Sequence, residues 1–166
     1  MVKKYAYDST QQSGFTLIDL SIAIAIIGIL AVIAMLQYQV YLGKAQAGRV
    51  INELGQLRLN VEECLQMGMT TVGSGSTECN PHAPASNLLV GNSQTGETLP
   101  VGMGVAQVTS PLTISTNITG ILSTKAMPAL SGTKVIWSRA NDGSWQCISN
   151  IEAKYLPEYC QRNENI

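Results

Sequence analysis

Residues 14–36 place one acidic side chain at the start of an otherwise apolar stretch. The stretch begins Gly-Phe-Thr-Leu-Ile-Asp at residues 14–19 and continues to Leu36, with Ser21 as the only hydroxyl in residues 20–36. As a helix, residues 15–36 would extend roughly 33 Å, which is enough to cross the hydrocarbon core of a bilayer. An ionised group at the centre of such a helix costs about 2.5–3.5 kcal/mol and usually has a function. Asp19 is therefore the first candidate functional residue.

The charges that flank this stretch predict its orientation. Lys3 and Lys4 precede it, and the next basic residue is Lys44. This asymmetry favours a cytoplasmic amino terminus, with the rest of the chain carried across the membrane. A secretory signal peptide would have a shorter apolar region and a better cleavage site than residues 31–34 offer. A permanent signal anchor explains the length and the charge asymmetry, but neither alternative explains an acid in the first turns of the helix.

The composition of the chain argues against a soluble enzyme or a general nucleic-acid-binding protein. Charged residues make up 13% of the 166 residues, roughly half the usual share. Ten basic and eleven acidic residues give a net charge of −1, so charge does not indicate nucleic-acid binding. The sequence contains no Walker-type loop, HExxH or GxSxG motif and has a single histidine. We therefore expect no catalytic residues, no cofactor and no metal.

The four cysteines Cys64, Cys79, Cys147 and Cys160 are widely spaced and form no CxxC pair. Zinc sites usually need closely spaced thiolates or imidazoles, so a zinc site is disfavoured. An even number of cysteines downstream of a membrane segment favours disulfide bonds in an oxidising compartment. Free buried thiols are the alternative, and four cysteines allow three pairings.

An amphipathic pattern follows the apolar stretch without a helix-breaking residue. Apolar side chains recur at intervals of three and four residues, as expected for one face of a helix: Val50, Leu54, Leu57, Val61 and Cys64. We expect one continuous helix from about residue 15 to about residue 65, roughly 75 Å long. Residues 15–36 would be covered by lipid or by other copies of the chain, and residues 37–67 would pack on a domain.

The remainder of the chain has the pattern of a loop followed by β-strands. Residues 68–100 are rich in Gly, Ser, Thr and Pro, and His82 between two prolines is expected to be a solvated loop residue. Residues 101–108 and 112–119 have strand-like composition. Residues 134–139 and 144–148 flank an Asn-Asp-Gly sequence, which predicts a hairpin. Trp137 and Trp145 are interpreted as packing residues within it.

Three segments of the amino-terminal region resemble the class III leader and first helix of type IV pilins: residues 14–20, 26–31 and 37–41. The resemblance implies that a prepilin peptidase removes residues 1–14 by cutting between Gly14 and Phe15, and that the new amino group of Phe15 is methylated. It also implies that Asp19 pairs with this amine between neighbouring subunits and sets the register of assembly. A carboxylate near a helix amino terminus is favoured by the helix dipole as well.

Two residues depart from the pattern of that family. The family usually has glutamate at the position of Asp19, which is one methylene shorter, and proline at the position of Leu36. Proline would remove a backbone donor and loosen the helix. We therefore expect a straighter first helix in this chain.

The other end of the chain carries a second resemblance. The Trp-Gln-Cys at residues 145–147 and the Lys-Tyr-Leu-Pro-Glu-Tyr-Cys at residues 154–160 resemble the disulfide-bounded carboxy-terminal loop of type IVa pilins. With this resemblance, the favoured pairings are Cys64 with Cys79 and Cys147 with Cys160. The first would tie the end of the helix to a loop and contribute about 3 kcal/mol.

Together these patterns predict an α+β pilin fold, in which a long helix packs on a small antiparallel sheet spanning residues 101–166. The resemblance implies a structural pilus subunit that polymerises through its apolar helix, with roles in adhesion, twitching motility or DNA uptake. Its implied partners are copies of itself, the peptidase and the inner-membrane assembly machinery. The precursor would lie in the inner membrane with a periplasmic carboxy-terminal domain, and the mature subunit in an extracellular pilus. A minor pilin or type II secretion pseudopilin remains an alternative, as does a membrane-anchored periplasmic binding module.

Overall fold

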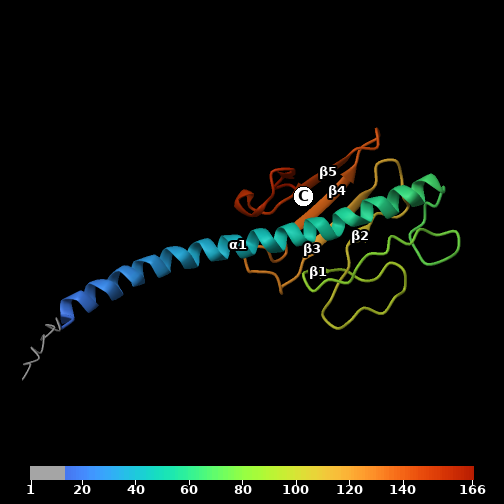
Figure 1. The fold of residues 1–166 in the computed structure, drawn as a ribbon. Helices are drawn as coiled ribbons and strands as arrows, with labels where there is room; N and C mark the ends of the chain where they lie inside the picture. The colour runs from blue at the N-terminus through green and yellow to red at the C-terminus, as the bar shows by residue number, and fades with distance from the viewer. Residues whose placement is uncertain (1–13) are drawn as a thin grey trace, which may run out of the picture. The chain divides into compact units, whose positions relative to one another are not determined.

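A computed structural model describes residues 14–166, so the predicted leader lies outside the described residues except for Gly14. Figure 1 shows one long helix, α1 (Leu17–Gln66), followed by a loop-rich region and a β-sheet. The strands are β1 (Leu89–Val90), β2 (Gln107–Val108), β3 (Asn117–Leu122), β4 (Lys134–Arg139), β5 (Trp145–Ser149) and β6 (Cys160–Arg162), with a short 3₁₀ helix, η1 (Ala153–Tyr155), between β5 and β6. The chain divides into two compact units, of which the first ends at Tyr38 and the second is Gln39–Ile166.

Helix α1 confirms the prediction of one uninterrupted helix, since its 50 residues run through Leu36 without a break. Its last turn closes with two backbone bonds, in which Gly68 N donates to Leu65 O and Met69 N donates to Cys64 O. This pair of bonds satisfies carbonyl groups that have no partner inside the helix. The predicted apolar stripe is also confirmed, because every one of its members is buried within the second unit: Val50, Leu54, Leu57, Val61 and Cys64.

The sheet has the strand order β1-β3-β4-β5-β6, with β2 also pairing with β3. The predicted hairpin is confirmed as β4 and β5, whose register places Trp137 opposite Cys147 and Arg139 opposite Trp145. Gly143 in the connecting loop has a positive φ of 87°, which suits the glycine of an Asp-Gly turn. The sheet is not purely antiparallel, however, because β6 runs parallel to β5. Cys147 and Cys160 are paired in that register, so the disulfide joins two neighbouring strands rather than closing a free loop.

Two predicted strands have the wrong bounds. Residues 101–106 form turns and an isolated bridge rather than a strand, and β2 is limited to Gln107–Val108. Residues 112–116 precede β3, which instead continues through Gly120 to Leu122. The predicted strand stops before Gly120, but β3 passes through this residue, and Leu54 of α1 packs against it. A Cβ at this position would lie 2.8 Å from Leu54 Cδ1.

The core of the second unit lies between the buried stripe of α1 and one face of the sheet. Ile51 and Leu54 of α1 are fully buried, as are Ile118 of β3 and Val135 of β4. Trp137 is 7% exposed, and its indole Nε1 donates to Ile51 O at 3.0 Å. Trp145 is partly buried and packs against the same core. Both tryptophans therefore pack as predicted, and Trp137 also joins β4 to the backbone of α1.

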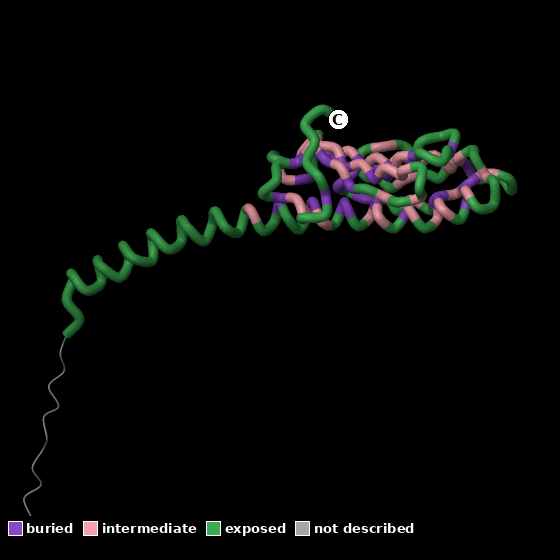
Figure 2. Tube along the Cα trace, turned by 90° about the horizontal axis from the view of Figure 1, so that it is seen from above, coloured by how far each residue is buried: buried purple, intermediate pink, exposed green. Residues whose placement is uncertain are grey.

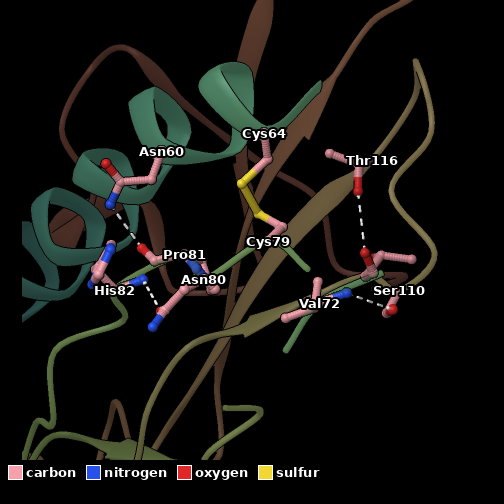
Figure 3. The surroundings of a disulfide bond; sticks show 10 residues. Asn60, Cys64, Val72, Cys79, Asn80, Pro81, His82, Ser110 and Thr116 are labelled. Atoms are coloured by element: carbon pink, nitrogen blue, oxygen red, sulfur yellow. Dashed lines mark hydrogen bonds between the residues drawn. A yellow bond between two sulfur atoms is a disulfide. The ribbon is translucent and has the colours of Figure 1, made fainter. Parts of the chain in front are cut away.

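Both disulfides have the predicted pairings, Cys64 with Cys79 and Cys147 with Cys160. Figure 3 shows the first of them joining the end of α1 to the loop that follows it. In the same view Asn60 Nδ2 donates to Pro81 O at 2.8 Å, so this loop is held to the helix at a second point. His82 is exposed, as expected for a loop residue, and its backbone N donates to Asn80 Oδ1.

Gly43 and Gly48 form a matched pair for testing the packing of η1 on α1. A Cβ on Gly43 would lie 2.5 Å from the Tyr155 ring, whereas a Cβ on Gly48 would meet nothing within 4 Å. We expect Gly43→Ala to destabilise the unit by about 1–3 kcal/mol through overpacking. Gly48→Ala should instead stabilise it by up to about 1 kcal/mol, since alanine favours the helix. Urea unfolding of the detergent-solubilised chain measures both, and equal effects would contradict the assigned contact.

Tryptic digestion without reduction tests both disulfides. The arrangement of Lys and Arg residues predicts that Cys64 and Cys79 stay in one peptide, residues 59–125, which carries its own internal bond. Cys147 and Cys160 should instead link two peptides, residues 140–154 and 155–162. Mass spectrometry would overturn these pairings if it found residues 59–125 linked to residues 140–154.

Candidate assembly site

Every residue of the apolar half of α1 is exposed among the described residues of the first unit, 14–38. Figure 2 shows this part of the helix as exposed, and Phe15 is 82% and Leu17 88% exposed. The apolar side chains cover all sides of the helix, so they do not form a single stripe. An 18-residue window within α1 has a mean hydropathy of 2.8, so the helix is long and apolar enough to cross a membrane. Such a surface needs an apolar environment that the chain itself does not supply.

Asp19 lies in the first turn of α1, where it forms a reciprocal cap with Thr16. The backbone N of Thr16 donates to Asp19 Oδ2 at 3.1 Å, and Asp19 N donates to Thr16 Oγ1 at 3.3 Å. The Thr16 hydroxyl also donates to Asp19 Oδ2. This capping box satisfies amide donors that have no partner inside the helix, and the carboxylate complements the positive end of the helix dipole.

The cap leaves part of the Asp19 carboxylate available for another partner. Both hydrogen bonds that the carboxylate accepts from Thr16 use its Oδ2 atom, and Asp19 is exposed. In the uncut chain the nitrogen of Phe15 is an amide in the peptide bond to Gly14. The predicted partner of Asp19, a Phe15 ammonium group, therefore arises only when that bond is cut.

A second polar cluster joins α1 to the sheet. Arg139 of β4 donates to both carboxylate oxygens of Glu62, from Nε at 2.8 Å and from Nη2 at 3.2 Å. Trp145 Nε1 also donates to Glu62 Oε1 at 2.7 Å, and Arg139 Nη1 donates to Ile114 O at 2.7 Å. These bonds stabilise the ionised form of Glu62, chiefly through Arg139. They hold the pKa of Glu62 below its ordinary value despite partial burial, and they raise the pKa of Arg139.

No group of three or more His, Cys, Asp or Glu side chains within residues 14–166 is arranged to hold a metal ion. The cysteines are all joined in disulfides, and the backbone N of His82 donates to Asn80 Oδ1 (Figure 3). The polar clusters in this part of the chain thus act as a helix cap and as an ion pair between helix and sheet.

Two protein families match this chain. Residues 43–161 match the family described as Pilin (bacterial filament), and residues 9–35 match the prokaryotic N-terminal methylation motif. The first match covers most of α1's packed half and all of the sheet except Arg162, and the second covers Gly14, Phe15 and Asp19. The chain belongs to the pilin family.

Its relatives include subunits of type IV fimbriae. The chain is 46% identical to a probable minor fimbrial protein of Dichelobacter nodosus, over 92% of this chain and 97% of the relative. It is 37% identical to the type IV major fimbrial protein FimA of the same organism, over 90% and 96% of the two chains. A fimbrial protein of Pseudomonas aeruginosa is 33% identical over 92% and 96%.

Sequence reasoning missed two of the functional arrangements. The capping box could have been found, because Thr16 and Asp19 have the spacing of that motif before an apolar run. The Glu62–Arg139 pair joins residues 77 positions apart, and no local pattern indicates which acid of α1 faces β4. The identification of this pair required the three-dimensional structure, which shows the position of Arg139 on β4.

Glu62→Gln tests the ion pair through its pH dependence. Because the folded pKa of Glu62 is lowered, its contribution is present above the unfolded value of about 4.3 and is lost as pH falls through the folded pKa. We expect the variant to lose about 1–2 kcal/mol at pH 7 and to approach the wild type near pH 2. Glu63→Gln, at the exposed neighbouring position, is the control. Urea unfolding that gave the same loss for Glu62→Gln at both pH values would contradict this role.

Proposed function

We propose that this chain is a structural subunit of a type IV fimbria and that it polymerises by burying the apolar half of α1 among the same helices of other subunits. The observation that carries the proposal is the fully exposed apolar helix of the first unit in a chain of the pilin family. Burial of even half of these side chains, at about 25 cal/mol per Å², amounts to tens of kcal/mol per subunit before the opposing entropy is counted. Such a fibre should resist detergent and salt.

Before assembly, the same helix anchors the precursor in the inner membrane. The amino terminus is cytoplasmic, in agreement with Lys3 and Lys4 ahead of the apolar stretch. The carboxy-terminal unit is periplasmic, which suits its two disulfides. The inner-membrane assembly machinery then moves the subunit from lipid into the fibre, where one apolar environment replaces another.

Cleavage between Gly14 and Phe15 by the prepilin peptidase prepares the subunit for assembly. The match to the N-terminal methylation motif supports this step. The new Phe15 amine, once methylated, carries a positive charge beside the amino terminus of α1. We propose that Asp19 of a neighbouring subunit pairs with it, because opposite charges attract strongly in low dielectric. The exposure of Asp19 and its single-oxygen cap with Thr16 support this pairing.

The fimbria would serve adhesion, twitching motility or DNA uptake, and catalysis has no part in this function.

A low-abundance subunit of the fimbria is a second candidate function. It is favoured because the chain is more similar to two probable minor fimbrial proteins, at 46% and 44% identity, than to FimA, at 37%. The copy number relative to the main subunit in sheared fimbriae decides between the two.

Asp19→Ala and Asp19→Glu test the assembly role. We expect Asp19→Ala to insert in the membrane and to be cleaved, since neither step needs the pairing, but to yield about tenfold fewer fimbriae as sole subunit. Asp19→Glu retains the charge and should assemble. Quantification of sheared fibres by immunoblot, beside the amount of cleaved subunit in membranes, measures both steps. Normal yields of fibres from Asp19→Ala would contradict the pairing.

A further inference from the structure

A groove on the surface of the second unit contains a guanidinium group without an acidic partner. The groove has a volume of about 570 Å³ and lies over Asn52, Gln56 and Arg58 of α1, Trp137 of β4 and Tyr159 before β6. We call it the Arg58 groove. The four ion pairs within residues 14–166 use the cations of Arg49, Arg139, Lys154 and Arg162, and Arg58 takes part in none of them.

Arg58 is held in a fixed position at the floor of this groove. Its Nε donates to Gly55 O at 2.9 Å, and its Cζ lies 3.9 Å from the centroid of the Trp137 ring. Trp137 is itself fixed by its bond to Ile51 O. These contacts leave the Nη groups of Arg58 as donors, and a planar guanidinium presents two parallel N–H groups to a carboxylate.

The rest of the groove suits a ligand that is part acidic and part apolar. Asn52 and Gln56 are exposed amides, and no acidic residue lines the groove within the described chain. Tyr159 is 58% exposed, with its ring stacked near Trp137 at a centroid distance of 6.5 Å. An exposed aromatic ring beside an arginine is typical of residues that dominate protein interfaces.

A complementary surface lies on residues 97–103 of the same chain, which we call the 97–103 loop. Glu97 is exposed and takes part in none of the ion pairs within residues 14–166. Val101 is fully exposed and Met103 is 41% exposed. Lys125 Nζ donates to Gly102 O at 2.9 Å and holds the turn in place. The loop thus presents a carboxylate and two apolar side chains to solvent.

We propose that, in the assembled fimbria, the Arg58 groove of one copy receives the 97–103 loop of a second copy. Arg58 binds the Glu97 carboxylate of that copy, while Val101 and Met103 cover Tyr159. Glu63 and Glu158 are also exposed, but they belong to the elements that build the groove itself. A contact between two different surfaces is heterologous, and it builds an open helical fibre when the rotation between copies does not close a ring. This inference rests on the proposed function.

Charge reversal in the full chain, expressed as sole subunit, tests the pairing. We expect Arg58→Glu and Glu97→Arg each to lower the yield of sheared fimbriae about tenfold through like-charge repulsion, and the double variant to restore it to within about twofold. Lys44→Glu is the control and should assemble normally, because Lys44 is an exposed cation of α1 that takes part in none of these ion pairs. Glu97 lies on an exposed loop, so its substitution tests assembly without disturbing the core.

Normal assembly of Glu97→Arg, or a double variant as defective as the single ones, would overturn the pairing. If wild-type fibres form and only Asp19→Ala reduces them, this inference fails and the proposed function stands. If the wild-type chain enters no fibre, both fail.

A cross-link provides a second readout that does not depend on yield. Gln56→Cys combined with Thr98→Cys should give a ladder of linked copies on a nonreducing gel of oxidised fimbriae, whereas each single variant should not. Intact fibres without a ladder would also overturn the contact.

Discussion

Helix α1 is one continuous helix whose two halves have different surroundings. From Gly43 onward its buried residues form a single stripe, which the second unit covers. Before Tyr38 apolar residues surround the helix, and nothing else in the described part of the first unit, residues 14–38, covers them. The sheet, the disulfides and the Glu62–Arg139 pair stabilise only the second unit. The first unit therefore depends on lipid or on other subunits, and this dependence links the fold to polymerisation.

The second unit shows how a small domain holds half of a long helix. Leu54 packs into the space left by Gly120, and Trp137 bonds to the helix backbone at Ile51. The Cys64–Cys79 bond fixes the end of the helix to the following loop. A small domain buries little apolar surface, so burial alone contributes little to its free energy of folding. Disulfides and buried hydrogen bonds add stability by restricting the conformations of the chain.

The long helix, its buried stripe and the β4–β5 hairpin could be predicted from sequence, because each has a local period or a turn signal. The pairings of the disulfides followed from a family resemblance rather than from spacing. The bounds of β3 could not be predicted, because glycine weakens the interior of a strand. The close approach of Leu54, which leaves no room for a Cβ at Gly120, joins residues far apart in the sequence. The parallel pairing of β6 and the choice of Glu62 as the partner of Arg139 depend on contacts between distant residues.

Asp19 links the fold to the proposed function. Its cap with Thr16 explains how an acid is stabilised at the start of the helix, and the assembly role that we propose for it requires a new amine at Phe15. The mass of the amino-terminal peptide from protein isolated from cells tests this account most directly. We predict that the mature chain begins at Phe15 and carries a methyl group on its amino nitrogen. A mature chain that begins at Met1 would contradict the account and would favour a permanently anchored protein.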